Sequence, residues 1–240
     1  MAQKGVLYMI PCPISDSTEV FDVVPEANRR IMDSLDYFIV ENVRSARRFL
    51  SKARVSRRIE ELEFVELNEH TVAGAAIEAM VRPIETGRSA GVISEAGVPG
   101  VADPGADIVA LAHRHGVRVV PLVGPSSILM VMMASGQNGQ SFAFNGYLPI
   151  ETSARNQKIK ELENDAYRKD MTQIFIETPY RNNRLIETLC KTLRPDTLLC
   201  VASAITDSDH ESIVTLKVKQ WAKRKYNYDK IPTIFLIYHP

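Results

Sequence analysis

The segment SEAGVPGVADPG at residues 94–105 packs three glycines, two prolines and two acidic residues into twelve positions. It follows an apolar run at 90–93 and precedes a helix-like stretch at 106–116. It matches neither G-x-G-x-x-G nor a Walker loop, the two common phosphate-binding motifs. Its glycines let main-chain groups approach a ligand, and its prolines hold the backbone in place. This glycine loop (residues 94–105) therefore suits an amide-rich, zwitterionic ligand.

Three further loops that follow predicted strands carry glycine, proline, hydroxyl or charged residues, at 11–17, 41–44 and 124–127. Ligands of open parallel sheets bind beyond the carboxyl ends of the strands, so four such loops together indicate one site. Ser126 and Ser127 stand where a helix is expected to begin, and their hydroxyl and N–H groups can receive a carboxylate there. Neither the glycine loop nor GPSS at 124–127 contains Lys or Arg, which argues against a polyphosphate ligand.

Alternating strands and helices must position these loops. Apolar runs predict strands at 6–10, 37–40, 64–67, 90–93 and 117–123. Amphipathic stretches predict helices at 26–35, 44–53, 71–87, 106–116 and 126–136. This order is typical of an α/β fold with a parallel sheet and right-handed crossovers. The apolar ILMVMMA within the last helix predicts the core face of a buried helix.

The second half predicts another α/β unit, with a sheet of mixed strand direction. Its expected strands are 141–148, 172–177, 196–204 and 233–238, its helices are 151–170 and 181–193, and 212–225 is a strand that runs into a short helix. The polar connection GQNGQ at 136–140 sets the expected boundary. We therefore predict an N-terminal α/β domain at 1–138 and a C-terminal α/β domain at 139–240.

Composition narrows the class of protein. The formal net charge is zero and the pI is about 7.0, which disfavours a general nucleic-acid binder but leaves room for a local basic patch. The three cysteines show no C-x-x-C spacing, and the five histidines form no cluster with ligand spacing, so no disulfide framework or metal site is expected. The longest apolar run is too short for a membrane span, which leads us to expect a soluble, cytoplasmic protein.

Six motifs occur in a characteristic order: LYMIPCPISD, VEN-R, ISEAGVPGVADPG, VVPLVGPSS, FNGYLP and FIETPYR. Together they resemble the ribosomal RNA small-subunit methyltransferase I family, within the tetrapyrrole methylase superfamily of class III S-adenosylmethionine-dependent methyltransferases. The resemblance implies two α/β domains with S-adenosyl-L-methionine in a cleft between them, and a homodimer. It implies 2′-O-methylation of a ribose in small-subunit ribosomal RNA, and thus RNA or the ribosomal subunit as partner.

The resemblance also implies a cofactor site. The methionine end is expected against Val98 to Val101 and the two serines of GPSS, and Ile14 is expected to pack on the cofactor. The adenosine is expected near Thr178, Ala202 and Pro232–Thr233. The predicted cofactor-binding residues are Ile14, Gly97, Val98, Val101, Ser126, Ser127, Thr178, Ala202 and Thr233.

Charged residues near these loops are candidates for catalysis. Glu41 could orient the nucleophile or accept its proton, and Arg44 could hold a phosphate. The alternative is that Glu41 caps the next helix and pairs with Arg44. Glu95 could contact the cofactor's ammonium group or receive turn N–H groups, while Asp103 is expected to brace its own loop.

The basic run RSARRFLSKARVSRR at 44–58 carries seven basic residues and no acidic one. It is a candidate RNA-phosphate patch, with Arg47, Arg48, Arg57 and Arg58 as RNA-binding residues; the alternative is a solvated helix face. A second basic run at 217–225 contains the only tryptophan, Trp221, and its alternating start favours a structural strand.

Some segments depart from the family pattern. The loop after the first strand is CPISD where the family has T-P-I-G-N, and ASAITD at 202–207 replaces A-R-E-L-T-K. Two alternatives therefore stay open. One is a methyltransferase of a tetrapyrrole or another small metabolite, and the other is a non-catalytic relative that binds RNA or the ribosome.

Overall fold

A computed structural model describes residues 3–67 and 74–239. The chain divides into two compact units, Met1–Ser126 and Ser127–Pro240, each with its own five-stranded sheet. The α/β class predicted from the sequence is confirmed. No helix among the described residues is long and apolar enough to cross a membrane.

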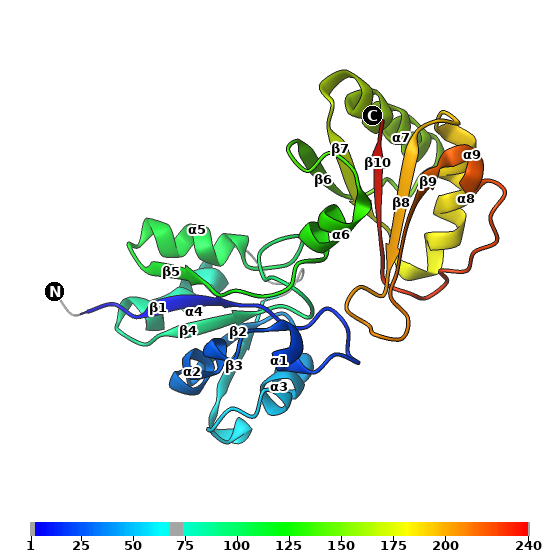
Figure 1. Ribbon diagram of the computed structural model, residues 1–240. Coiled ribbons are helices and arrows are strands. Elements are labelled where there is room, and N and C mark those ends of the chain that lie inside the picture. Colours follow the sequence, from blue (N-terminus) through cyan, green and yellow to red (C-terminus); the bar gives the residue numbers. More distant parts are fainter. Residues whose placement is uncertain (1–2, 68–73, 240) are drawn as a thin grey trace. The chain divides into compact units, whose positions relative to one another are not determined.

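The first unit contains an entirely parallel sheet in the order β3-β2-β4-β1-β5 (Figure 1). Its strands are β1 (Val6–Ile10), β2 (Tyr37–Val40), β3 (Glu63–Glu66), β4 (Ala90–Ile93) and β5 (Arg118–Pro121). Its helices are α1 (Val20–Val23), α2 (Ala27–Ser34), α3 (Val43–Lys52), α4 (Ala75–Glu85) and α5 (Ala106–Arg114), with a 3-10 turn, η1, at Ile59–Glu61. All five strands run in the same direction, so the described loops that follow β1, β2, β4 and β5 gather at one edge.

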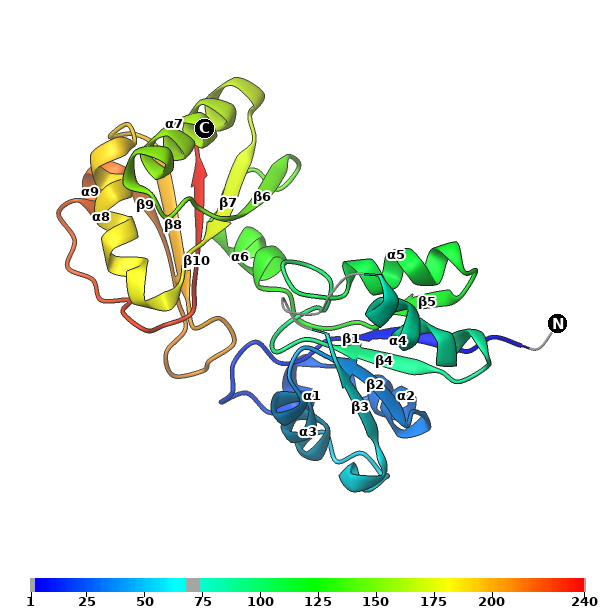
Figure 2. The same ribbon diagram turned by 180° about the vertical axis from the view of Figure 1, so that it is seen from behind.

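Helices cover both faces of this sheet because strand side chains alternate between the faces. Leu7 and Met9 of β1 pack with α4 and α5 in one core cluster. Ile10 and Cys12 belong to a second cluster with α1, α2 and α3. Figure 2 shows the two helix layers from behind. The result is a three-layer α/β/α unit whose three central strands, β2, β4 and β1, are nearly continuous apolar runs.

The second unit has a mixed sheet in the order β6-β7-β10-β8-β9, in which only β6 and β7 are parallel. Its elements are α6 (Ser127–Ser135), β6 (Phe142–Tyr147), α7 (Thr152–Lys169), β7 (Thr172–Ile176), η2 (Pro179–Arg181), α8 (Asn182–Thr192), β8 (Leu198–Ser203), β9 (Ser212–Lys217), α9 (Val218–Trp221) and β10 (Thr233–Tyr238). Three helices, α7, α8 and α9, pack on one face of this sheet, and α6 contacts β9 and β10.

Some local predictions hold in part and others are wrong. Trp221 is fully buried and its indole N–H donates to the C=O of Leu199 at 2.8 Å. The start of the second basic run is not the predicted strand, because only Lys217 belongs to β9 and Val218–Trp221 form α9. The prediction that ILMVMMA is the core face of a buried helix holds only in part: Val131 and Met132 are buried, but Leu129 and Met133 are 55% and 85% exposed. These two residues lie one turn apart, so a whole stripe of α6 is uncovered. The sequence reading also missed α1 and η1, which are short.

The first unit of the structure ends at Ser126, twelve residues before the boundary expected at 138–139. The physical reason is that α6 packs on the second sheet, where Thr215 Oγ1 donates to the C=O of Ser135 at 2.8 Å. The assignment of two domains to 1–138 and 139–240 stays a prediction. The start of the helix expected at 71–87, at 71–73, lies outside the described residues.

Candidate functional site

The glycine loop folds back on itself between β4 and α5. The N–H of Gly100 donates to the C=O of Pro104 at 3.2 Å. Gly97, Gly100 and Gly105 have φ of +69°, +81° and +131°, in the region that favours glycine. A Cβ on Gly105 would also lie only 3.4 Å from the nitrogen of Gly100. The unusual density of glycine and proline therefore encodes a tight, fixed backbone reversal at the carboxyl end of β4.

The loop after β1 is joined to the glycine loop by an isolated antiparallel bridge. The N–H of Cys12 donates to the C=O of Gly97 at 2.8 Å, and the N–H of Gly97 donates back at 3.2 Å. Cys12 is 3% exposed, and burial together with nearby Asp103 raises the pKa of its thiol. The thiol donates to the C=O of Ser94 at 3.5 Å, which makes Cys12 a structural residue rather than a nucleophile.

Within this clamped backbone, two amides stay available. The N–H groups of Val98 and Val101 donate to no acceptor among the described residues, whereas those of Gly97 and Gly100 are both engaged. Val101 is also 49% exposed. Free, pre-positioned N–H groups suit a carboxylate or carbonyl. Val98 and Val101 are two of the positions predicted for the cofactor's methionine end.

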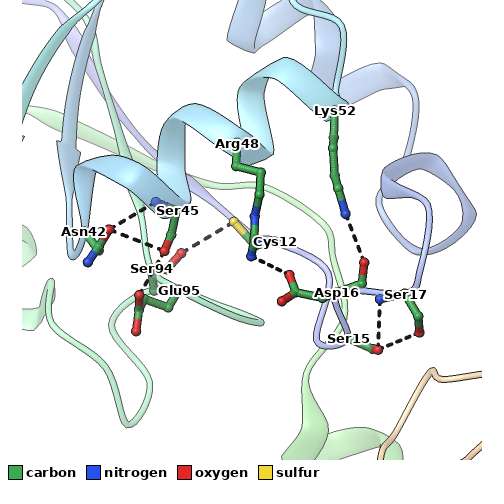
Figure 3. A network of polar contacts seen from close by, with 10 residues as sticks. All are labelled: Cys12, Ser15, Asp16, Ser17, Asn42, Ser45, Arg48, Lys52, Ser94 and Glu95. Carbon is green, nitrogen blue, oxygen red and sulfur yellow. Dashed lines mark hydrogen bonds and ion pairs between the residues drawn. The ribbon is translucent and has the colours of Figure 1, made fainter.

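The loop after β2 adds a polar network (Figure 3). The N–H of Glu95 donates to Glu41 Oε2 at 3.0 Å, and Ser45 Oγ donates to Glu95 Oε1 at 2.9 Å. Asn42 caps α3, because its Oδ1 accepts from the N–H of Ser45 at 3.1 Å. The alternative in which Glu41 caps this helix is therefore wrong. Glu41 instead holds the start of the glycine loop, and the exposed Arg44 has no partner among the described residues.

Asp103 is the carboxyl group whose acidity the site changes most. Its pKa is raised to about 6 by burial first, then by the negative charge of Glu41 and of Glu95, against a hydrogen bond from Ser94 that lowers it. Three carboxylates thus gather at the carboxyl edge of the first sheet. The sequence analysis predicted only a bracing role for Asp103, because the order of residues does not show that Glu41 and Glu95 lie near enough to raise its pKa. A raised carboxyl pKa in such a place marks a candidate proton acceptor.

A small pocket opens between the loop after β1 and helix α3. Its wall includes Cys12, Ser45 and Glu95. The charged residues Asp16, Arg48 and Lys52 also line it. Arg48 Nη2 lies 2.7 Å from Asp16 Oδ1, and Lys52 Nζ donates to the C=O of Asp16 at 2.9 Å (Figure 3). Asp16 therefore anchors its loop to α3. The sequence gave no specific signal for Lys52 in this contact.

The four arginines predicted to bind RNA are all exposed, and two of them pair with acidic side chains outside the run. Arg48 pairs with Asp16, and Arg57 Nε donates to the C=O of Asp33 at 3.4 Å. Arg58 Nε lies 3.9 Å from both Glu60 and Glu61, while the Arg47 guanidinium lies 5.6 Å from the centre of the Phe64 ring. The run that is free of acid in sequence is partly neutralised in space.

The predicted cofactor residues of the second unit meet at one end of its sheet. Thr178 follows β7, Thr233 begins β10 and Ala202 lies near the end of β8. Ile234 pairs with both Ile176 and Ala202, which brings the three neighbouring strands into register there. Asn182 Nδ2 donates to Thr233 Oγ1 at 3.1 Å. In the first unit, Ile14, Gly97, Val98 and Val101 lie in loops beyond the carboxyl ends of the strands; Ser126 ends the unit, and Ser127 is the first residue of α6.

A solved structure shares this fold. The chain has the fold of the methyltransferase CobJ, with a TM-score of 0.62, 18% identity, and coverage of 98% of this chain and 94% of CobJ. No family model matches the sequence.

The particular relatives are more specific. Proteins named ribosomal RNA small subunit methyltransferase I match at 30% identity in Vibrio cholerae, over 73% of this chain and 56% of the relative. The match in Mesorhizobium japonicum has 32% identity over 74% and 56%, and that in Pasteurella multocida has 26% over 97% and 79%. The chain is a divergent homologue of these proteins, which confirms the resemblance of its motifs. It spans little more than half the length of the first two.

Proposed function

We propose that this protein is an S-adenosyl-L-methionine-dependent methyltransferase that methylates the 2′-oxygen of a ribose in small-subunit ribosomal RNA. The observation that carries the proposal is the glycine loop, a backbone reversal that leaves the amides of Val98 and Val101 free at the edge of a parallel sheet. Homology to proteins named ribosomal RNA small subunit methyltransferase I supports the proposed reaction and acceptor.

The residues present fit this cofactor. The free amides of the glycine loop would receive its methionine carboxylate, and Ile14 and Ser126 lie in the neighbouring strand-end loops. Ser127 begins α6, where helix N–H groups favour an anion. Gly97 has a positive φ, which glycine adopts without strain because it has no Cβ, and this turn lies beside the loop after β1. We propose Thr178, Ala202 and Thr233 of the second unit for the adenosine.

When bound, S-adenosylmethionine supplies a methyl group on a positively charged sulfur, which demands alignment and a dry site more than a strong acid. A ribose hydroxyl loses its proton as it becomes an ether. Asp103 is suited to take that proton because its pKa of about 6 lies close to neutral pH. Glu41 positions the glycine loop through the N–H of Glu95, and Arg44 is free to hold a phosphate of the acceptor.

Calorimetric titration with S-adenosylhomocysteine, the product of the reaction, tests the cofactor site. We expect one saturable site per chain, and Val98→Asp should weaken it at least about tenfold because a carboxylate would then face the ligand's own. Ala110→Asp introduces the same charge at an exposed position on α5 and should bind normally. Transfer of labelled methyl groups to small ribosomal subunits that lack the modification then tests the acceptor.

The outcomes separate the alternatives. Absence of binding at high micromolar ligand would contradict the proposal and favour the non-catalytic relative that binds RNA. Normal binding without transfer to ribosomal subunits would favour a small-metabolite acceptor. A homodimer and a cytoplasmic location belong to the same proposal, and sedimentation of the purified protein tests the dimer.

A further inference from the structure

A second polar pocket lies in the second unit, where the start of α7, the end of β7 and the start of α8 meet. This arginine pocket is lined by Ile150, Arg155, Glu177, Arg181, Arg184 and Leu185. Its volume is about 100 Å³, well below the roughly 300–1,000 Å³ of sites for organic ligands. It therefore suits a group of a few atoms. None of Thr178, Ala202 and Thr233 lines it, so it is distinct from the proposed adenosine contacts.

The charges in the arginine pocket are unbalanced. Three guanidinium groups face one carboxylate, Glu177, whose side chain is 1% exposed. Glu177 Oε1 accepts from Nε and Nη2 of Arg181, at 3.0 and 2.7 Å, and from the N–H of Thr178 at 2.7 Å. Glu177 is therefore committed to Arg181. Arg155 and Arg184 have no ion-pair partner among the residues described for this unit.

Arg155 is the pocket residue that most clearly lacks a partner. The residue is only 6% exposed, and its Nη1 donates to the C=O of Ile150 at 3.0 Å. Its Nε is buried and has no hydrogen-bond partner. Glu151 is near enough to feel its charge, but the oxygens of Glu151 accept from the N–H groups of Ser153 and Ala154. A water molecule could satisfy the Nε donor, yet it would leave the buried charge without a counter-ion. An anion would meet both needs.

An exposed aromatic residue, Tyr180, directly precedes the pocket residue Arg181 in the chain. Tyr180 stands between Glu177 and Arg181 in the chain and is 74% exposed. Lys230 Nζ lies 6.0 Å from the centre of its ring. Proteins bind single-stranded RNA with cationic side chains for its phosphates and exposed aromatic rings on which its bases stack. The arginine pocket, Tyr180 and Lys230 supply both kinds of group.

We propose that the arginine pocket is an oxyanion subsite for a phosphate group, and that this phosphate is a backbone phosphodiester of the RNA acceptor. Arg155 and Arg184 supply the charge, and Arg181 is held in place by Glu177. The RNA source rests on the function proposed above, whereas the oxyanion specificity does not. Free inorganic phosphate offers the same chemistry, so the experiment has one arm for each source.

The test compares Arg184→Gln with Arg168→Gln. Arg184 lines the pocket without an ion-pair partner within the described chain, so its replacement should leave the fold intact. Arg168 is an exposed residue of α7, outside the pocket, and controls for the same loss of charge. Fluorescence anisotropy measures binding of a short single-stranded RNA at several salt concentrations, and calorimetry measures binding of inorganic phosphate. S-adenosylhomocysteine binding is measured on every variant.

We expect Arg184→Gln to weaken RNA binding about tenfold and to reduce the salt slope by about one, because one charged phosphate contact is lost. Arg168→Gln should change neither. If Arg184→Gln abolishes phosphate binding but leaves RNA binding unchanged, the oxyanion subsite is supported with free phosphate as its ligand. If neither ligand responds to Arg184→Gln, the proposal is overturned and the arginines are structural. Failure of S-adenosylhomocysteine to bind the unmodified protein would contradict the methyltransferase function alone.

Discussion

The basic run of the first unit and the arginine pocket of the second contain the same residue type in opposite surroundings. The basic run spreads its arginines over exposed surface, where Arg48 and Arg58 each pair with an acidic residue outside the run. The arginine pocket encloses Arg155 beside one buried carboxylate that is already bound to Arg181. The run carries more basic residues, yet only the pocket holds a buried guanidinium, that of Arg155, without an ion-pair partner in the described chain. Local density of Lys and Arg is thus a poorer guide to an anion site than burial and pairing.

Exposed and buried charges also differ in how much they contribute to the free energy of unfolding. Exposed ion pairs contribute about 0–1 kcal/mol, because water and salt screen them and long side chains lose entropy. A buried charge that loses its partner costs about 3–5 kcal/mol. Changes in the buried cluster should therefore have the largest effects on stability, and changes in the exposed run the smallest.

Glu177→Gln should have the largest effect. It removes the buried carboxylate that holds Arg181 and the N–H of Thr178, and should lower the free energy of unfolding by about 3–5 kcal/mol. Urea unfolding followed by tryptophan fluorescence measures this, since the only tryptophan, Trp221, lies in the core of the second unit. Glu161→Gln, at an exposed site of α7, should change stability by less than about 0.5 kcal/mol. Equal stability of the two variants would show that the buried pair contributes nothing.

Asp103→Asn should lower the rate of methyl transfer about 100-fold, the lower range for loss of a general base. The S-adenosylhomocysteine affinity should stay near that of the unmodified protein, because the free amides of the glycine loop are unaffected. In the unmodified protein the rate should fall as pH drops through about 6, where Asp103 becomes protonated. A rate unchanged by Asp103→Asn would remove Asp103 from the mechanism and leave Glu41 as the candidate.

Asp103→Asn should also change the free energy of unfolding, by less than Glu177→Gln does. The pKa of Asp103 is raised in the folded state, so its contribution to stability is fully present below the unfolded value near 3.8 and is lost as pH rises through about 6. Asp103→Asn should therefore stabilise the protein at pH 8 by about 1 kcal/mol, a figure reduced for solvent screening of a half-buried group, and should have no effect at pH 3. Thermal unfolding followed by circular dichroism at both pH values tests the sign; a loss of stability at pH 8 would contradict it.

Asp16→Asn should have the smallest effect on stability, less than about 1 kcal/mol, because the Arg48 pair is exposed. It should tighten binding of RNA about twofold at low salt, since it removes a negative charge and frees a cation. Asp22→Asn, an exposed acid on the neighbouring α1, is the matched control. Anisotropy titrations of both variants would show whether the basic run binds RNA at all: an identical affinity in the two would favour a merely solvated helix face.

The parallel sheet, four of its strand-end loops and the mixed second sheet follow from local patterns. Apolar runs of four or five residues that alternate with amphipathic stretches leave few other solutions. The end of the first unit was harder to predict, because α6 joins the second unit through packing on β9 and β10 rather than through any break in composition. The polar segment at 136–140 is a connection within the second unit instead.

By itself, the sequence determined the α/β class and the kinship with ribosomal RNA small subunit methyltransferase I proteins, and it predicted the glycine loop as the place of the site. Glycines at positive φ and prolines affect the conformation of their own backbone, so their effect is local and can be predicted from the sequence. The tertiary structure alone decided the raised pKa of Asp103 and the unpaired charge of Arg155. Each arises from residues distant in sequence that burial brings together, and electrostatic interactions depend on distance and burial rather than on order along the chain.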